Sequence, residues 1–179
     1  MSEEEDGITI LFFDKPNISY VEEETLGQKI NHEEFFTFLA KKRELHVRFY
    51  WRSNESESSY GVHLRQLRIN LQAQGVRFES IETDKDVDIA MLNDMFTMLF
   101  DTDDSSAKSA NIILCSGDKA FSVILGAAKR RFDIPTTIIS GKNHCAEVLK
   151  KIAQEVIFIE DMVDDNESLL LKPFESEEL

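Results

Sequence analysis

Six apolar runs of strand length recur along the chain, and segments with helical periodicity lie between them. The runs are rich in Val, Ile and Phe and occupy residues 8–13, 46–51, 76–81, 111–115, 134–139 and 156–159. The intervening segments repeat apolar residues at helical spacing over residues 33–43, 60–74, 86–100, 119–131 and 144–154. This alternation predicts a three-layer α/β/α domain with a central parallel sheet of five or six strands. We expect the strand order 3-2-1-4-5, in which strands one and four are neighbours.

Two of the apolar runs end in an aspartate. The run 8–13 leads into Asp14, and the run 111–115 leads through Ser116 and Gly117 into Asp118. A third carboxylate, Asp88, lies at the start of the helix expected after the third strand. Functional groups of a parallel sheet gather beyond the carboxyl ends of its strands. The sequence therefore predicts that Asp14, Asp88 and Asp118 lie together at one edge of the sheet.

Carboxylates that gather in one place repel one another and take up protons unless a counter-charge is present. Mg²⁺ or Mn²⁺ supplies that charge, prefers oxygen ligands and suits phosphate-ester chemistry. Asn17, close to Asp14, would orient that carboxylate or donate to a phosphate. Each acid also has a local explanation. Asp88 suits a helix N-terminus, Asp118 suits an N-cap, and Asp14 suits a turn.

The negative charge of the chain is concentrated at its two ends. The formal net charge is −14, which by itself argues against a nucleic-acid partner. Residues 1–6 carry −4 and residues 160–179 carry −7, which leaves only −3 on residues 7–159. The nearly balanced centre weakens the objection to nucleic acid. We expect an acidic extension over 1–6, a domain over 7–162 and an acidic flexible tail over 163–179.

Several classes of protein are disfavoured by the sequence. No apolar run approaches the ~20 residues of a membrane span, and the acidic N-terminus lacks the basic region of a signal peptide. The two cysteines, Cys115 and Cys145, are too few for a zinc site built on cysteine pairs. The sequence has no phosphate-binding loop, dinucleotide fingerprint or serine nucleophile elbow. We expect a cytoplasmic protein that does not interact with membranes.

Three motifs, in this order and spacing, resemble those of the NYN domain, a PIN-like group of metal-dependent ribonucleases that includes the LabA-like proteins. The first strand ends in D-x-x-N at residues 14–17. KDVD at residues 85–88 resembles the K-G-V-D element of that family, and Asp94 is the following acid on the same helix. SGDKAF at residues 116–121 resembles S-G-D-x-D-F. The similarity spans roughly residues 7 to 162.

The resemblance implies a PIN-like fold, a metal cofactor and a catalytic set. It implies hydrolysis of RNA phosphodiester bonds by Asp14, Asp88, Asp118 and Asn17. It also implies that the three aspartates hold Mg²⁺ or Mn²⁺, with Asp94 as a further ligand or a supporting residue. Asp94 lies six residues after Asp88, about 120° away around an ideal helix.

Two positions depart from the family pattern. Ala120 stands where the family usually has a second acid, and Asp86 stands where it usually has glycine. The missing acid removes a metal ligand or a group that positions water. An alternative interpretation is therefore a catalytically weakened NYN domain that acts as an RNA- or protein-binding regulatory module.

RNA is the expected partner, and residues near the expected site are candidates to contact it: Lys85, Lys119, Arg52, Lys142 and Ser116. Trp51 and Tyr60 are candidates to stack on bases. The basic side chains also suit an ordinary solvated surface. A protein partner that binds the acidic ends, or a homodimer, stays open.

Overall fold

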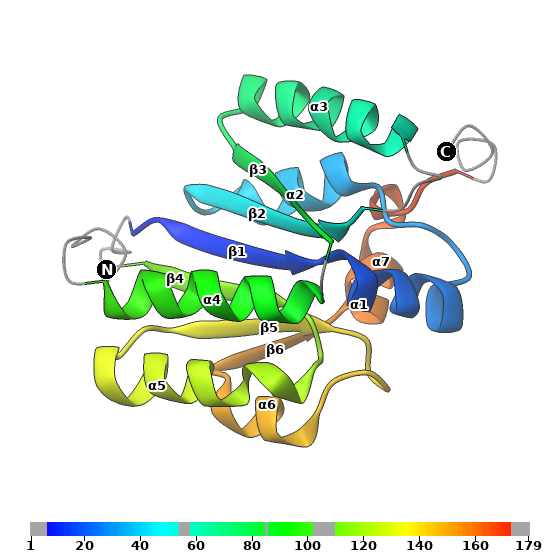
Figure 1. Ribbon diagram of the computed structural model, residues 1–179. Helices are drawn as coiled ribbons and strands as arrows, with labels where there is room; N and C mark the ends of the chain where they lie inside the picture. Colours follow the sequence, from blue (N-terminus) through cyan, green and yellow to red (C-terminus); the bar gives the residue numbers. More distant parts are fainter. Residues whose placement is uncertain (1–6, 54–57, 85, 102–109, 173–179) are drawn as a thin grey trace.

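The protein contains a six-stranded parallel sheet, as Figure 1 shows. The computed structural model describes residues 7–53, 58–84, 86–101 and 110–172. The strands are β1 (Thr9–Asp14), β2 (Leu45–Arg52), β3 (Arg77–Thr83), β4 (Asn111–Cys115), β5 (Thr136–Ser140) and β6 (Glu155–Phe158). Their order is β3-β2-β1-β4-β5-β6, and all neighbouring pairs are parallel. The predicted fold class and strand order are confirmed.

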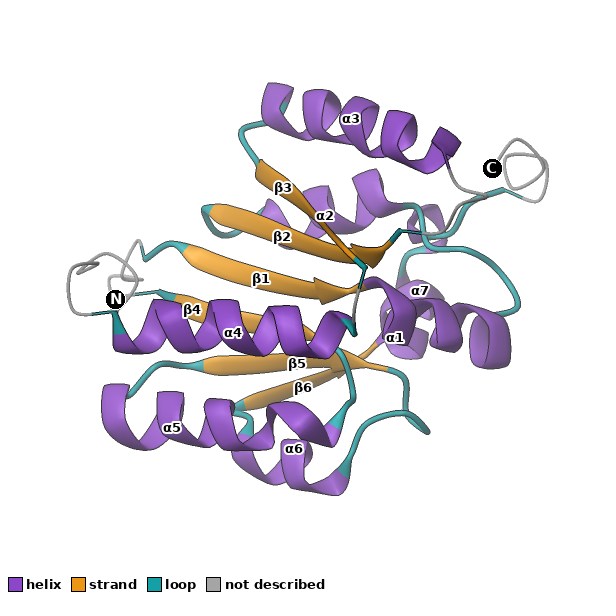
Figure 2. Cartoon of the chain, in the orientation of Figure 1, coloured by secondary structure: helices purple, strands orange, loops and turns teal. Residues whose placement is uncertain are grey.

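Helices cover both faces of the sheet, and the alternation of side chains along each strand decides which residues meet which helices (Figure 2). On one side, Leu11 and Phe13 of β1 belong to a core shared with α1 (Lys15–Val21), α2 (His32–Ala40), α3 (Ser58–Ala73) and α7 (Ile159–Asp165). On the other side, Phe12 belongs to a core shared with α4 (Val87–Phe100), α5 (Ser122–Phe132) and α6 (Glu147–Ile152). The central strands β1 and β4 are mostly apolar because both of their faces are buried.

The segment after β1 is more ordered than the sequence suggests. Residues 14–30, for which no helix was predicted, contain α1 and a π-helical turn, Glu22–Leu26. Asp14 is the N-cap of α1, and Pro16 lies at its N-terminus, where a missing N–H costs little. The turn ends at Gly27, whose φ of 64° is left-handed. A helix of this length gives too few repeats for its periodicity to be recognised.

The expected flexible tail over residues 163–179 needs correction. Val163 is buried in α7, and a short 3₁₀ turn, Glu167–Leu169, buries Leu169 to 1% exposure. The chain then forms an antiparallel bridge between Leu170 and Ile30, flanked by two backbone hydrogen bonds to residues 29 and 31. Burial of these apolar side chains outweighs the surrounding acids, so residues 163–171 belong to the domain. Residues 173–179 and the acidic extension 1–6 lie outside the described residues.

Among the residues that the structure describes, no helix is long and apolar enough to cross a bilayer. The other expected boundaries agree with the observed helices to within a few residues, apart from α6, which is shorter than expected. Because all neighbouring strands are parallel, the segments that follow β1, β4 and β5 lie at the same edge of the sheet.

Candidate functional site

Asp14 lies at the carboxyl end of β1, between β2 and β4, and is only 5% exposed. Both of its carboxylate oxygens accept hydrogen bonds. The hydroxyl of the fully buried Ser116 donates to Oδ2 at 2.9 Å, and the backbone N–H of Asn17 donates to Oδ1 at 3.2 Å. Contacts from two segments thus fix the direction of this carboxylate.

The glycine after β4 is required by close packing. A Cβ atom on Gly117 would lie 1.7 Å from the carbonyl oxygen of His144, which no side chain can tolerate. The N–H of Gly117 donates to Oδ1 of Asn17 at 3.1 Å, and its carbonyl accepts from the N–H of Ala146 at 3.0 Å. Gly117 therefore joins the segment after β1 to the segment after β5.

Asp118 has the capping role that its sequence context suggested. Its Oδ1 accepts from the N–H of Ala120 at 2.9 Å, so it is the N-cap of the 3₁₀ turn Lys119–Phe121 that precedes α5. Its own N–H donates to Oγ of Ser116 at 3.3 Å. The Asp118 carboxylate is half-buried and retains an oxygen that this cap does not use. Capping and a site role are therefore compatible.

The charges of Asp88 and Asp118 act on Asp14. Asp88 is half-buried in the first turn of α4. The pKa of the Asp14 carboxyl is raised from 3.8 to about 6. Burial is the largest cause; the hydrogen bonds from Ser116 and Asn17 lower the pKa, and the negative charges of Asp118 and Asp88 raise it. The three acids are thus near enough to interact. Even so, no three acid, imidazole or thiol groups of the described residues converge as a ready metal-binding cluster.

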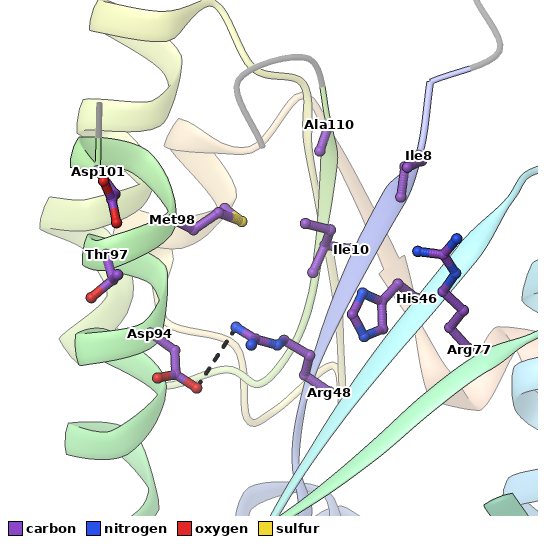
Figure 3. A pocket seen from close by; sticks show the side chains of 10 residues that line it. All are labelled: Ile8, Ile10, His46, Arg48, Arg77, Asp94, Thr97, Met98, Asp101 and Ala110. Atoms are coloured by element: carbon purple, nitrogen blue, oxygen red, sulfur yellow. Dashed lines mark ion pairs between the residues drawn. The ribbon is translucent and has the colours of Figure 1, made fainter. Parts of the chain in front are cut away.

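Asp94 makes its contacts in a different group of side chains. The hydroxyl of Tyr50 donates to Asp94 at 2.6 Å, and Nη1 of Arg48 lies 3.7 Å from the same carboxylate oxygen. Burial, followed by this hydrogen bond, raises the pKa of Tyr50. Figure 3 shows Asp94 and Arg48 in a cavity of about 290 Å³. The cavity is lined by Ile8, Ile10, His46, Arg48, Arg77, Asp94, Thr97, Met98, Asp101 and Ala110.

This cavity lies near the amino ends of the strands, away from the carboxyl edge, because Ile8 precedes β1 and Ala110 precedes β4. Arg48 also contacts Glu79 at 3.4 Å, as does His46 at 3.2 Å. The contacts of Asp94 are therefore those of a paired surface network. They do not connect it to the other three carboxylates.

The candidate RNA-binding residues occupy different environments. Lys119 and Arg52 are exposed at the carboxyl edge, whereas Ser116 is fully buried and its hydroxyl is engaged by Asp14. Lys142 is exposed, but its ammonium group is paired with Asp161 and its backbone N–H donates to Glu160. Lys85 lies outside the described residues. Lys119 and Arg52 are therefore the exposed candidates at the carboxyl edge of the described structure.

The aromatic candidates Trp51 and Tyr60 are less exposed than stacking on a base requires. Trp51 is 8% exposed and packs edge-on against Tyr60, with ring centroids 5.2 Å apart. Tyr20, which was not among the candidates predicted from sequence, is 56% exposed on α1. Tyr20 follows Asn17 by three residues, which places both near one face of a helix. That signal becomes visible only when residues 15–21 are recognised as helical.

Comparisons with known proteins agree with this architecture. The family model of the NYN domain matches residues 8–160. A crystal structure of a protein of unknown function from Vibrio parahaemolyticus RIMD 2210633 has a TM-score of 0.69. It is 18% identical in sequence, and the match covers 96% of this chain and 100% of that one, so it supports the fold alone. No curated protein sequence matches the chain.

Proposed function

Because the chain belongs to the NYN domain family, we propose that it is a ribonuclease that hydrolyses RNA phosphodiester bonds with the aid of Mg²⁺ or Mn²⁺. The observation that carries the proposal is the position of Asp14. It is buried at the carboxyl edge, and two acids from other elements, Asp88 and Asp118, act on its charge. A fold maintains such a concentration of negative charge at a cost, and a bound cation offsets that cost.

The donor chemistry suits a hard divalent cation. All three groups offer carboxylate oxygens, and Mg²⁺ is commonly held by one or two carboxylates together with waters and substrate phosphates. Asp14, Asp88 and Asp118 would hold the cation without a fully preformed cage. When bound, the cation would offset the phosphate charge and lower the pKa of a water molecule that it binds.

Ser116 and Asn17 act as positioning residues in this proposal. The Ser116 hydroxyl holds Asp14 from the neighbouring strand, and it also accepts from the N–H of Asp118. Asn17 connects the helix after β1 to the backbone of Gly117. These bonds tie Asp14 and Asp118 into one unit, which keeps two carboxylates in a constant relation.

Lys119 and Arg52 are the cations that we assign to the RNA backbone. Lys119 follows Asp118 directly, and Arg52 ends β2, whose Tyr50 is in register with Asp14. Both side chains are exposed. Phosphate contacts of this kind position a nucleic acid without reading its sequence.

A second candidate function rests on Ala120. Its backbone N–H, rather than a side-chain acid, contacts Asp118, and its methyl group contributes no ligand. If the missing acid abolishes hydrolysis, the domain would bind RNA or a protein and regulate it without cutting. The two functions predict different outcomes in one experiment.

That experiment is single-turnover cleavage of a labelled RNA panel with Mn²⁺ by the native protein, Asp118→Asn and Ala120→Asp. Asparagine caps a helix as well as aspartate, so Asp118→Asn should keep the fold. For a nuclease, we expect native cleavage, a loss of about 10²-fold or more in Asp118→Asn and a gain in Ala120→Asp.

Other outcomes decide against the nuclease. RNA binding without turnover by the native protein, with cleavage appearing in Ala120→Asp, supports the binding module. Activity that survives Asp118→Asn indicates a contaminating nuclease. A native protein that neither binds nor cleaves RNA contradicts both functions.

A further inference from the structure

Tyr20 is an aromatic side chain exposed beside the proposed catalytic site. Most phenylalanines of the described chain are buried in one of the two cores, whereas the Tyr20 ring is 56% exposed. It lies on α1, which begins directly after Asp14. Singly exposed aromatic residues are common on protein surfaces, so the case for Tyr20 depends on the groups around it.

The backbone of the site fixes the place of this ring. Tyr20 lies one helical turn, about 4.5 Å along the axis, beyond Asn17. The side chain of Asn17 accepts from the N–H of Gly117 at 3.1 Å. Tyr20 therefore keeps a constant distance from the Ser116–Asp118 segment.

The ring of His144 packs against the ring of Tyr20. The two rings are perpendicular, at 87°, with centroids 5.2 Å apart. Nε2 of His144 lies 3.1 Å from Oγ1 of Thr25, and the His144 carbonyl packs on Gly117. The perpendicular arrangement leaves at least one face of the Tyr20 ring uncovered by His144.

We propose that Tyr20, supported by His144, is a stacking platform for a base of single-stranded RNA one or two nucleotides from the bond that is cleaved. This inference rests on the proposed ribonuclease function. Stacking on an aromatic ring contributes to RNA binding without regard to sequence. Glu23 and Glu24 are exposed just after Tyr20 and repel phosphate groups. At this edge, RNA binding therefore has to come from base stacking rather than from attraction to the phosphates.

A base enclosed in a duplex cannot present its face to the ring, so the platform selects single strands. This separates the platform from a purely structural role. If Tyr20 only held the His144 loop in place, its loss would weaken binding of single-stranded and duplex RNA alike.

The test measures the dissociation constant of a short fluorescein-labelled single-stranded RNA by fluorescence anisotropy. All proteins carry Asp118→Asn so that RNA is not cleaved, and a duplex of the same sequence is measured in parallel. Tyr20→Ala should bind the single strand at least about fivefold more weakly, the lower end of what one lost base stack causes. Tyr20→Phe, which retains the ring, should bind as the parent does.

Phe96→Ala is the matched control, because Phe96 is a 58% exposed ring on the outer side of α4. The inference is overturned if Tyr20→Ala and Phe96→Ala have equal affinities, or if single strand and duplex are weakened to the same extent. Native protein that still cleaves RNA in that case leaves the proposed function intact. Absence of both cleavage and RNA binding in the native protein would remove the function and the platform together.

Discussion

Replacing Asp14 with asparagine should stabilise the metal-free protein at neutral pH. Folding raises the pKa of Asp14 from 3.8 to about 6. Below pH 3.8 the group is protonated in both states and folding carries no penalty. As the pH rises through about 6, the unfolded chain ionises first and stability is lost. The full penalty is about 3 kcal/mol, from 1.36 kcal/mol per pKa unit.

Asparagine has the same shape and no charge. Its amide oxygen can still accept from the N–H of Asn17, and the Ser116 hydroxyl can rotate to accept from the amide nitrogen. We therefore expect the exchange to keep most of the hydrogen bonding at this position. What it removes is the cost of ionising a buried carboxyl group.

The assay is urea unfolding of native and Asp14→Asn proteins in EDTA as a function of pH. The sequence pI is about 4.7, so measurements start at about pH 5 to avoid precipitation. Between about pH 5 and 8, the stability of Asp14→Asn relative to the native protein should rise by about 1.4 kcal/mol. The difference between the two proteins cancels the other titrating groups.

Mn²⁺ should narrow this difference in stability. An ion that binds only the folded native protein adds about 1.4 kcal/mol at ten times its Kd, and Asp14→Asn should gain much less. A stability difference that stays constant with pH would refute the reasoning about burial. An equal response of both proteins to Mn²⁺ would remove Asp14 from the proposed metal site.

Two further variants test the framework of the site by urea unfolding. Gly117→Ala should lower the free energy of unfolding by about 3 kcal/mol or more, because its Cβ would overlap the His144 carbonyl. Gly61→Ala is the control, because an added Cβ in α3 would meet nothing within 4 Å; it should raise the free energy of unfolding by about 0.5–1 kcal/mol. Equal effects of the two would contradict the packing at Gly117. Glu22→Ala should lower the free energy of unfolding by about 3 kcal/mol, because the Lys15 ammonium group loses the largely buried carboxylate that lies 3.2 Å away. A decrease below about 1 kcal/mol would show that this pair behaves as a surface ion pair.

The sheet could be predicted from sequence because its strands carry an unmistakable signal. A parallel strand buried on both faces, such as β1 or β4, is a nearly continuous apolar run, and the six runs of strand length alternate with amphipathic segments. Topology alone then places Asp14, Asp88 and Asp118 at the same edge of the sheet, although they form no ready metal-binding cluster among the described residues. Their use as metal ligands does not follow and stays a prediction.

The remaining features depend on contacts that a linear pattern does not contain. Asp94 was expected to support the site, but the side chains that face it from β2, Tyr50 and Arg48, engage it instead. Ser116 was expected to contact RNA, but it is fully buried against Asp14. Both contacts depend on which face of one element meets which face of its neighbour. A pattern of residues along one segment does not contain that information.

The antiparallel bridge between Ile30 and Leu170 has a consequence for the order in which the protein assembles. It joins segments 140 residues apart in sequence, and such a contact forms late because a long loop must close first. Ile30 also donates its N–H to the buried Glu22, which is paired with Lys15 next to Asp14. We therefore expect the helix that carries Asn17 and Tyr20 to gain this support late in folding, after the strands of the sheet have paired.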